Sequence, residues 1–364
     1  MVGRVSRLAS LGSLVTVALA TVLAAGPAQA QLTVASTDGK TSFKLGGLAQ
    51  IQAESLDNAD GSSGENLFFR RLRILGLFKW GDKFSVFLET DSPNLGKANA
   101  AGAKDAGDVF IQDFAATYAF SKAFHVDAGM LLPALSYNHA QSAATLMPVD
   151  YGAFSFIESG PLQQRVGRDY GVQARGYVAG DKLEYRFGVF QGVRGPGATN
   201  SLRTAGRLMF YAIGPPQVGL FYRGTSLGKT RSLAFGVSAD RQEDYDMVGG
   251  DVFFEQPFGE GNGVTAQLDW QSWDGDTFVA IPEQETVLAE LGVYLAGPRL
   301  LPFVQYSAQD FDAVAGNDQE KLQVGVGYFM SGHNANLKLA FGRIEPDRGP
   351  ELDQLVLQLQ LFAF

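Results

Sequence analysis

Apolar and polar residues alternate with a period of two along most of this sequence, in segments of about ten residues. In KLEYRF (182–187) charged residues alternate with apolar ones, and in AQLDWQ (266–271) amides and a carboxylate do the same. Successive side chains of a β-strand point to opposite faces, so the pattern predicts strands with one polar and one apolar face. The chain is therefore constrained to an all-β fold.

The connections between the segments decide between a soluble sandwich, which gives the same alternation, and a membrane barrel. Long connections at 55–66, 92–107 and 133–168 alternate with short ones at 81–82 and 121–122. Long loops on one side and short turns on the other are typical of outer-membrane barrels. The last residue, Phe364, ends an alternating segment, which lets the sheet close; lipid offers no partner for an open edge. We predict a transmembrane antiparallel β-barrel.

The number of strands follows from counting these segments. They lie near 42–54, 67–79, 83–91, 108–120, 123–132, 169–179, 181–192, 200–211, 231–241, 246–256, 263–273, 285–296, 300–310, 320–331, 335–344 and 352–364. A further candidate at 216–224 would place the two chain ends on opposite sides of the membrane. We therefore interpret 213–230 as an unusually long periplasmic connection and predict about 16 strands. A barrel of that size encloses an aqueous lumen, so we expect a pore.

The first 30 residues read as a cleaved signal peptide. Arg4 and Arg7 precede an uncharged apolar stretch, and Ala28-Gln29-Ala30 supplies small residues for cleavage. Residues 31–364 then form one exported domain, which we expect in the outer membrane of a Gram-negative cell. Its expected partners are outer-membrane lipid, lipopolysaccharide and, through the terminal Phe364, the machinery that assembles such barrels.

Composition excludes several other classes. The exported part lacks the apolar stretches of ~20 residues that helical membrane proteins need, and the absence of cysteine excludes thiolate metal sites. A net charge of −9 argues against a nucleic-acid partner. The chain's three histidines, His125, His139 and His333, accompany no recognisable catalytic spacing, so we predict no enzyme, no metal and no cofactor. A barrel hydrolase and a structural or adhesive barrel without channel activity remain as alternatives.

The sequence resembles the phosphate-selective porin O and P family. The resemblance rests on the order of SFKLGGLAQIQ (42–52), FFRRLRILG (68–76), GRDYGVQARG (167–176), YRFGVFQG (185–192), GGDVFFEQPFG (249–259) and VGVGYFMSGHNANLKLAF (324–341). It implies a trimeric, sixteen-stranded porin that passes small anions. Arg70 and Arg71 match the tandem arginines of phosphate-selective members, whereas Leu48 stands where those members carry another arginine.

Candidate solute-binding residues are charged side chains on lumen-facing positions, because a narrow wall focuses their field on a passing ion. The candidates are Arg70, Arg71, Arg73, Arg175, Arg186, Arg203 and Arg207, with the acids Glu89 and Asp113. Adjacent Arg70 and Arg71 cannot both face the lumen of a regular strand, so Arg70 snorkels, lies near a rim or marks a bulge. The alternative is that the arginines pair with Glu89, Asp91, Asp113 and Glu184, which gives a hydrated wall with little selectivity.

The connection 133–168 is the longest in the chain and is rich in aromatic residues. Loops of that length in a compact structure are usually functional or disordered, and apolar content speaks against disorder. We expect this loop to fold into the lumen and narrow it, with Arg165 and Arg168 at its base. An outer lid or a trimer contact is the alternative. The predicted function is passive diffusion of small hydrophilic solutes, with anions such as phosphate among them.

Overall fold

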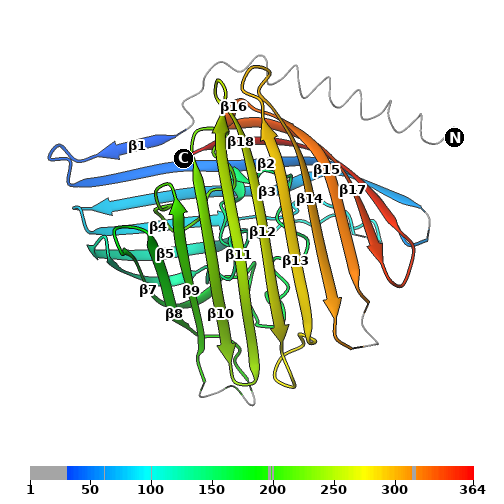
Figure 1. Cartoon of the computed structure of the whole chain (residues 1–364), viewed down its shortest axis with the longest axis horizontal. Helices are drawn as coiled ribbons and strands as arrows, with labels where there is room; N and C mark the ends of the chain where they lie inside the picture. The colour runs from blue at the N-terminus through cyan, green and yellow to red at the C-terminus, as the bar shows by residue number, and fades with distance from the viewer. Residues whose placement is uncertain (1–30, 61, 100, 196–197, 199–200, 314–316) are drawn as a thin grey trace.

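Sixteen strands form one closed antiparallel sheet in the computed structural model (Figure 1), which describes residues 31–364 except 61, 100, 196–197, 199–200 and 314–316. The predicted signal peptide, residues 1–30, lies outside the described residues. Within them, no helix is both long and apolar enough to cross a membrane. The predicted sixteen-stranded all-β barrel is confirmed.

The barrel strands follow the predicted segments closely. They are β2 (Thr41–Asp57), β3 (Ser63–Trp80), β4 (Phe84–Asp91), β5 (Phe110–Ser121), β6 (Phe124–Leu131), β7 (Asp169–Val178), β8 (Leu183–Phe190), β9 (Arg203–Ile213), β10 (Ser232–Gln242), β11 (Tyr245–Phe258), β12 (Asn262–Asp274), β13 (Gln284–Tyr294), β14 (Leu300–Phe311), β15 (Gln319–Tyr328), β17 (Ala335–Pro346) and β18 (Leu352–Ala363).

The ring closes where β18 pairs with β2, from Gln354↔Leu56 to Ala363↔Gly47. Closure leaves no strand edge unpaired in lipid. Two short strands add to the sixteen: β1 (Leu32–Ala35) pairs with the start of β2, and β16 (Met330–His333) lies in the turn before β17. The start of β2 and the end of β18 share one end of the barrel, which we take as the periplasmic end.

Side chains alternate between lumen and outer surface along each strand. In β8, Glu184 and Arg186 are buried inside the barrel, whereas Phe187 is 56% exposed on the outside. In β12, Gln267 is buried inside and its neighbour Leu268 is 50% exposed. An apolar outside and a polar inside are what a barrel in lipid requires.

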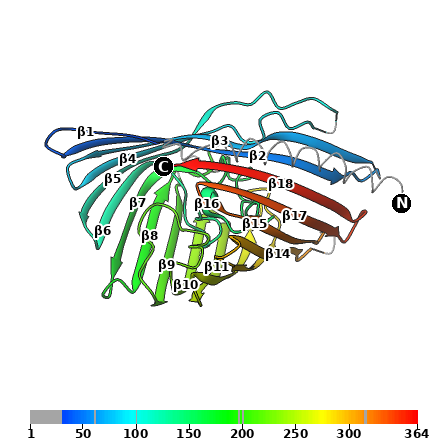
Figure 2. The ribbon, with the colours of Figure 1, turned by 90° about the horizontal axis from the view of Figure 1, so that it is seen from above.

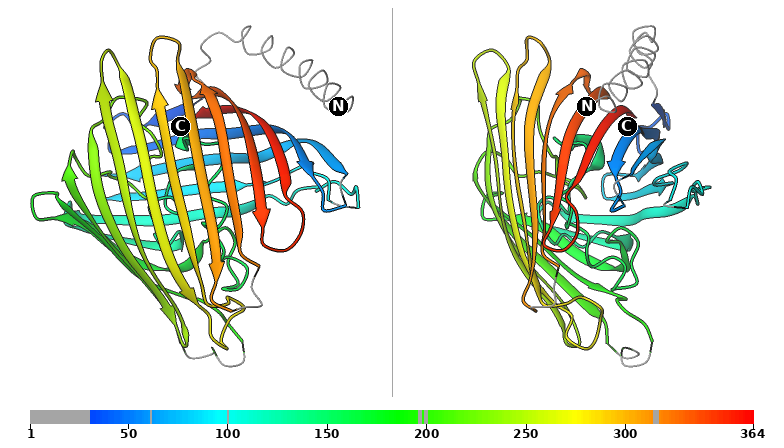
Figure 3. Two further views of the ribbon diagram at one scale, coloured as in Figure 1. Left: turned by 45° about the vertical axis from the view of Figure 1, so that its right-hand side comes forward. Right: turned by 90° about the vertical axis from the view of Figure 1, so that its right-hand side faces the viewer.

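The strands are strongly tilted, as closure of a sheet demands. In Figure 1, β2 to β5 run nearly horizontally on one wall, while β11 to β14 run nearly vertically on the other. The two views of Figure 3 show the same crossing from the side. Opposite walls therefore present their lumen-facing side chains to a common interior.

Two connections lie inside the barrel, where irregular segments cross the enclosed space in Figure 2. One is the long loop (residues 133–168), which follows β6 and contains the short 3-10 helix η1 (Ala143–Thr145). The other joins β9 to β10 and comprises residues 214–231, which we name the latch. The sequence predicts a periplasmic connection at 213–230. That prediction is wrong for the middle of the segment, where Tyr222 and Thr225 are fully buried among lumen-facing side chains.

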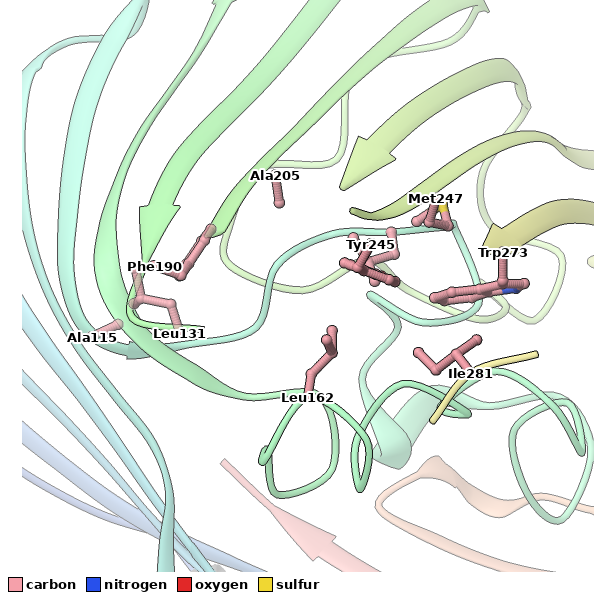
Figure 4. Close-up of a cluster of buried hydrophobic side chains, with 10 residues drawn as sticks. Ala115, Leu131, Leu162, Phe190, Ala205, Tyr245, Met247, Trp273 and Ile281 are labelled. Atoms are coloured by element: carbon pink, nitrogen blue, oxygen red, sulfur yellow. The ribbon is translucent and has the colours of Figure 1, made fainter. Parts of the chain in front are cut away.

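Apolar side chains of these segments pack against the wall in several clusters. In the cluster of Figure 4, Leu162 of the long loop and Ile281 of the 275–283 connection lie beside Tyr245, Met247 and Trp273 of β11 and β12. A second cluster joins Tyr137 of the long loop to Tyr222 of the latch and to wall residues of β9, β10 and β11. The barrel interior is thus partly a packed core and partly a network of charges.

Candidate functional site in the barrel lumen

Three of the predicted arginines form a row across neighbouring strands. Arg175 of β7 is the register partner of Arg186 on β8, and Arg186 is the partner of Arg207 on β9. Like charges directly opposite one another are destabilising unless they are compensated. Each member of this arginine row has its own carboxylate: Asp127 at 2.7 Å, Glu184 at 2.6 Å and Asp251 at 2.6 Å, respectively.

The tandem arginines of β3 meet at one carboxylate of the long loop. The register between β2 and β3 shifts at Gln50/Ile51, so Arg70 is left in a bulge beside Arg71. Both guanidinium groups then reach Asp150, each at 2.6 Å. Burial alone raises the pKa of Asp150, but Arg70 and Arg71 outweigh it and hold that pKa well below its usual range. The bulge removes the conflict of parity between these two adjacent residues.

Two further predicted arginines, Arg73 and Arg203, each contact two carboxylates. Arg73 bridges Glu89 at 2.6 Å and Asp91 at 2.9 Å. Arg203 contacts Asp240 at 2.5 Å and, more weakly, Asp169. These partners are buried with their arginines, so the pairs lie in the wall with little water around them.

The two arginines at the base of the long loop differ from each other. Arg168 is buried and pairs with Asp113 at 3.2 Å. Arg165 is exposed, and its guanidinium lies 3.7 Å from the centre of the Phe110 ring. The structure therefore brings Arg168 to the lumen wall and leaves Arg165 outside the charge network.

Five carboxylates that contact these arginines are absent from the predicted site: Asp127, Asp150, Asp169, Asp240 and Asp251. Asp127, Asp240 and Asp251 lie on lumen-facing positions of β6, β10 and β11. The alternation of side chains along these strands could have placed them on the lumen face. Asp150 lies in the long loop, where no periodicity assigns a direction to its side chain. The site is thus a set of arginine–carboxylate pairs, with no arginine of the row left without an acid.

The wall formed by β2 and β18 is neutral by comparison. Gln50 donates to Gln360 and Gln52 donates to Gln358, each at 2.8 Å. Leu48, which replaces an arginine of the resembled family, is buried against Ala143 and Ala144 of the long loop. No positive charge of β2 faces the lumen at that point, because an apolar contact with the loop takes its place.

The long loop is anchored from several sides. Lys338 of β17 donates to the carbonyl oxygens of Leu146 and Pro148, each at 2.7 Å. Within the loop, His139 and Glu158 are fully buried and lie 3.0 Å apart. Lumen-facing side chains on several strands, such as those of Gln50, Asp127 and Asn336, are fully buried. The long loop and the latch together fill much of the middle of the barrel.

The histidines do not assemble into a site. His125 belongs to β6, His139 to the long loop and His333 to β16. Among the described residues, no group of three or more His, Cys, Asp or Glu side chains is arranged to hold a metal ion.

Comparisons with known proteins point to one fold. No protein-family model and no curated protein matches the chain. The anion-selective porin from Comamonas acidovorans is similar in structure, with a TM-score of 0.60 and 12% identity over 88% of this chain and 99% of that one. OmpF of Salmonella typhi, solved in complex with daunomycin, gives a TM-score of 0.60 at 10% identity, covering 91% and 100% of the two chains. The channel DcaP of Acinetobacter baumannii gives 0.54 at 15% identity, covering 90% and 99%. The chain therefore has the barrel fold of outer-membrane porins, while the phosphate-selective family stays a resemblance.

Proposed function

We propose that this protein is a porin of the Gram-negative outer membrane, through which small hydrophilic solutes diffuse passively. The observation that carries the proposal is the closed barrel with an apolar outside, a lumen wall of arginine–carboxylate pairs and a long loop folded inward. A porin needs no catalytic group and no cofactor, since solutes move down their gradient and are filtered by the bore and its field.

Selectivity is the finer part of the proposal. Arg70, Arg71, Arg73, Arg175, Arg186, Arg203 and Arg207 line the passage, with Arg168, Glu89 and Asp113 at its outer end. A guanidinium fork suits phosphate or another oxyanion. Each such anion has to compete with a carboxylate that already holds the arginine, so we expect a modest anion preference rather than tight phosphate binding.

A structural or adhesive barrel without channel activity is the second candidate. The observation that favours it is the filling of the lumen by the long loop and the latch, since buried wall residues such as Gln50 and Asn336 have no contact with open water. The two candidates differ in one respect that is easily measured, which is conduction.

Export and assembly complete the proposal. We propose that residues 1–30 are removed as a signal peptide, that Phe364 is read by the barrel-assembly machinery, and that three copies associate in a membrane containing lipopolysaccharide. The ring of Phe364 lies 5.9 Å from that of Phe87 at the periplasmic end. It would have to be accessible before the barrel closes.

The experiment is a planar bilayer with the purified exported chain, across a gradient of KCl. A reversal potential of the same sign as the equilibrium potential of chloride, together with block of the current by added phosphate, supports the anion-passing porin. A reversal potential of the opposite sign supports a cation-preferring pore whose selectivity is set by its acidic residues. A bilayer that shows no channel current supports the structural barrel.

A further inference from the structure

The latch covers two members of the arginine row. Arg186 donates from Nη1 to the carbonyl oxygen of Leu220 at 2.6 Å and from Nη2 to that of Gly219 at 3.4 Å. Arg207 donates from Nε to the hydroxyl of Tyr222 at 3.2 Å. The Tyr222 ring also lies 4.6 Å below the Arg186 guanidinium. Two oxygens of the latch thus occupy a pair of neighbouring donors on Arg186, which is the arrangement an oxyanion would take.

Backbone pairing and a ring stack hold the latch against the long loop. The amide of Tyr222 donates to Ala140 at 2.8 Å, and the amide of Ser142 donates to Tyr222 at 2.8 Å. The Tyr222 ring stacks on that of Tyr137 at 4.9 Å. Burial raises the pKa of Tyr222 to about 12, so its hydroxyl stays protonated at neutral pH and donates to Glu184.

The latch fits its position only because it carries glycine at its closest contact. A Cβ atom on Gly224 would lie 2.4 Å from the carbonyl oxygen of Thr145 in the long loop. Backbone atoms cannot yield as a flexible side chain can, so any side chain at 224 forces the two segments apart. The docked position is therefore specified by the sequence of the latch itself.

The docked latch is also incompletely satisfied. Nε of Arg223, Oε2 of Glu255 and Nδ1 of His333 are buried beside it without a hydrogen-bond partner in the protein. Buried polar groups without partners oppose the state that buries them. In addition, no described salt bridge joins a latch residue to the wall or to the loop. The latch does make single hydrogen bonds to carboxylates, from the Tyr222 hydroxyl to Glu184 and from the Ser226 amide to Glu255. A segment without an ion pair, lying over unsatisfied groups, can leave at lower cost than one that is fixed by buried ion pairs.

We propose that the latch is an internal stand-in for the solute: its carbonyl oxygens occupy Arg186, and a small oxyanion (a carboxylate, sulfate or phosphate) that takes their place releases the latch toward the periplasm and widens the passage. This inference rests on the proposed porin function for its consequence, but not for its chemistry. A charged anion accepts stronger hydrogen bonds from a guanidinium than a neutral carbonyl does. The anion therefore favours the state in which the latch has left Arg186.

Limited proteolysis with trypsin tests the displacement on the folded protein in detergent. The peptide bond after Arg223 is enclosed between two buried residues, Tyr222 and Gly224, so cleavage there requires undocking. We expect inorganic phosphate to speed this cleavage several-fold over chloride at equal ionic strength. Gly224→Ala should be cut fast with or without phosphate, whereas Val218→Ser, in the exposed part of the latch, should match the wild type.

A reversible cross-link tests the consequence for conduction. Gln141 and Tyr222 are bridge partners, and the chain has no cysteine of its own, so Gln141→Cys with Tyr222→Cys can tie the latch to the loop. We expect the conductance of this variant to rise several-fold on reduction, while each single cysteine variant ignores the reductant.

The outcomes separate the two proposals. Cleavage after Arg223 that ignores phosphate, or that stays slow in Gly224→Ala, overturns the latch as a stand-in for the solute, and so does equal conductance of the oxidised and reduced double variant. Phosphate-dependent cleavage in a protein that forms no channels supports the displacement and refutes the porin.

Discussion

The long loop and the latch both lie inside the barrel, but different interactions hold them. The long loop is fixed by charge: Asp150 receives two arginines, Arg168 pairs with Asp113, and Lys338 binds two loop carbonyls. The latch is held by backbone hydrogen bonds, a ring stack and single hydrogen bonds to charged groups of the wall, among them Arg186, Glu184 and Glu255. No described salt bridge joins it to the wall or to the long loop.

This difference assigns different roles to the two segments. Breaking a buried ion pair by removing one partner is strongly destabilising, so the loop is a permanent part of the bore. The latch has no such ion pair among the described residues, and single hydrogen bonds can be exchanged for those of a solute or water at a smaller net cost. We therefore expect the loop to set the width of the passage and the latch to set whether the passage is open.

Removing the loop should have the largest effect. Deletion of residues 140–160 takes away Asp150, the backbone partner of the latch and most of the packing at mid-barrel. We expect single-channel conductance to rise sharply, by severalfold or more. The change of gel mobility on boiling checks that the deleted protein still forms a barrel, and a folded variant with unchanged conductance would contradict the role of the loop.

Acidification should act on the latch before it acts on the loop. His333 donates from Nε2 to the carbonyl of Thr225 at 2.9 Å, and burial lowers the pKa of His333 to about 4, with Lys338, Arg223 and Lys229 adding repulsion. The neutral imidazole stabilises docking fully above about pH 6.5, and this stabilisation is lost as pH falls toward 4, about 3 kcal/mol in all.

The measurement for this prediction is conductance against periplasmic-side pH. We expect the wild type to open progressively between pH 6 and pH 4, and His333→Gln, which keeps a donor but cannot titrate there, to stay level. Parallel curves for the two proteins would show that protonation of His333 does not move the latch.

Neutralising Asp150 should weaken the loop and change selectivity. Asp150→Asn leaves Arg70 and Arg71 without their shared carboxylate, at a cost of about 2 kcal/mol, since the pair with Arg70 is partly exposed to water. The reversal potential should shift toward that of chloride. Asp312→Asn, in an exposed loop, is the matched control, and an equal shift in both variants would remove Asp150 from the selectivity of the pore.

Changing Arg165 should have the smallest effect. Its exposed contact with Phe110 contributes under about 1 kcal/mol, so Arg165→Ala should leave conductance and reversal potential nearly unchanged. Arg168→Ala should alter both the conductance and the reversal potential, because Asp113 would lose its partner. Similar results for the two variants would contradict their different places in the structure.

The barrel could be predicted from sequence because two-residue periodicity is written into every strand, as in β8, where Glu184 and Arg186 face inward and Phe187 faces outward. Strand parity alone allows two interpretations of the lumen arginines, as free solute-binding groups or as partners of Glu89, Asp91, Asp113 and Glu184, and does not choose between them. The inward path of the latch could not be predicted, since its glycines and prolines fit a surface turn equally well. The role of Asp150 could not be predicted either, because the direction of its side chain depends on contacts of the loop and not on any local repeat.

Swelling of liposomes that contain the purified protein tests the porin most directly. Vesicles with the wild-type protein should swell in small neutral and anionic solutes, at rates that fall with solute size, and deletion of 140–160 should raise those rates. Vesicles that fail to swell with either protein, although both show the boiling-dependent mobility of a folded barrel, would contradict the proposed porin function.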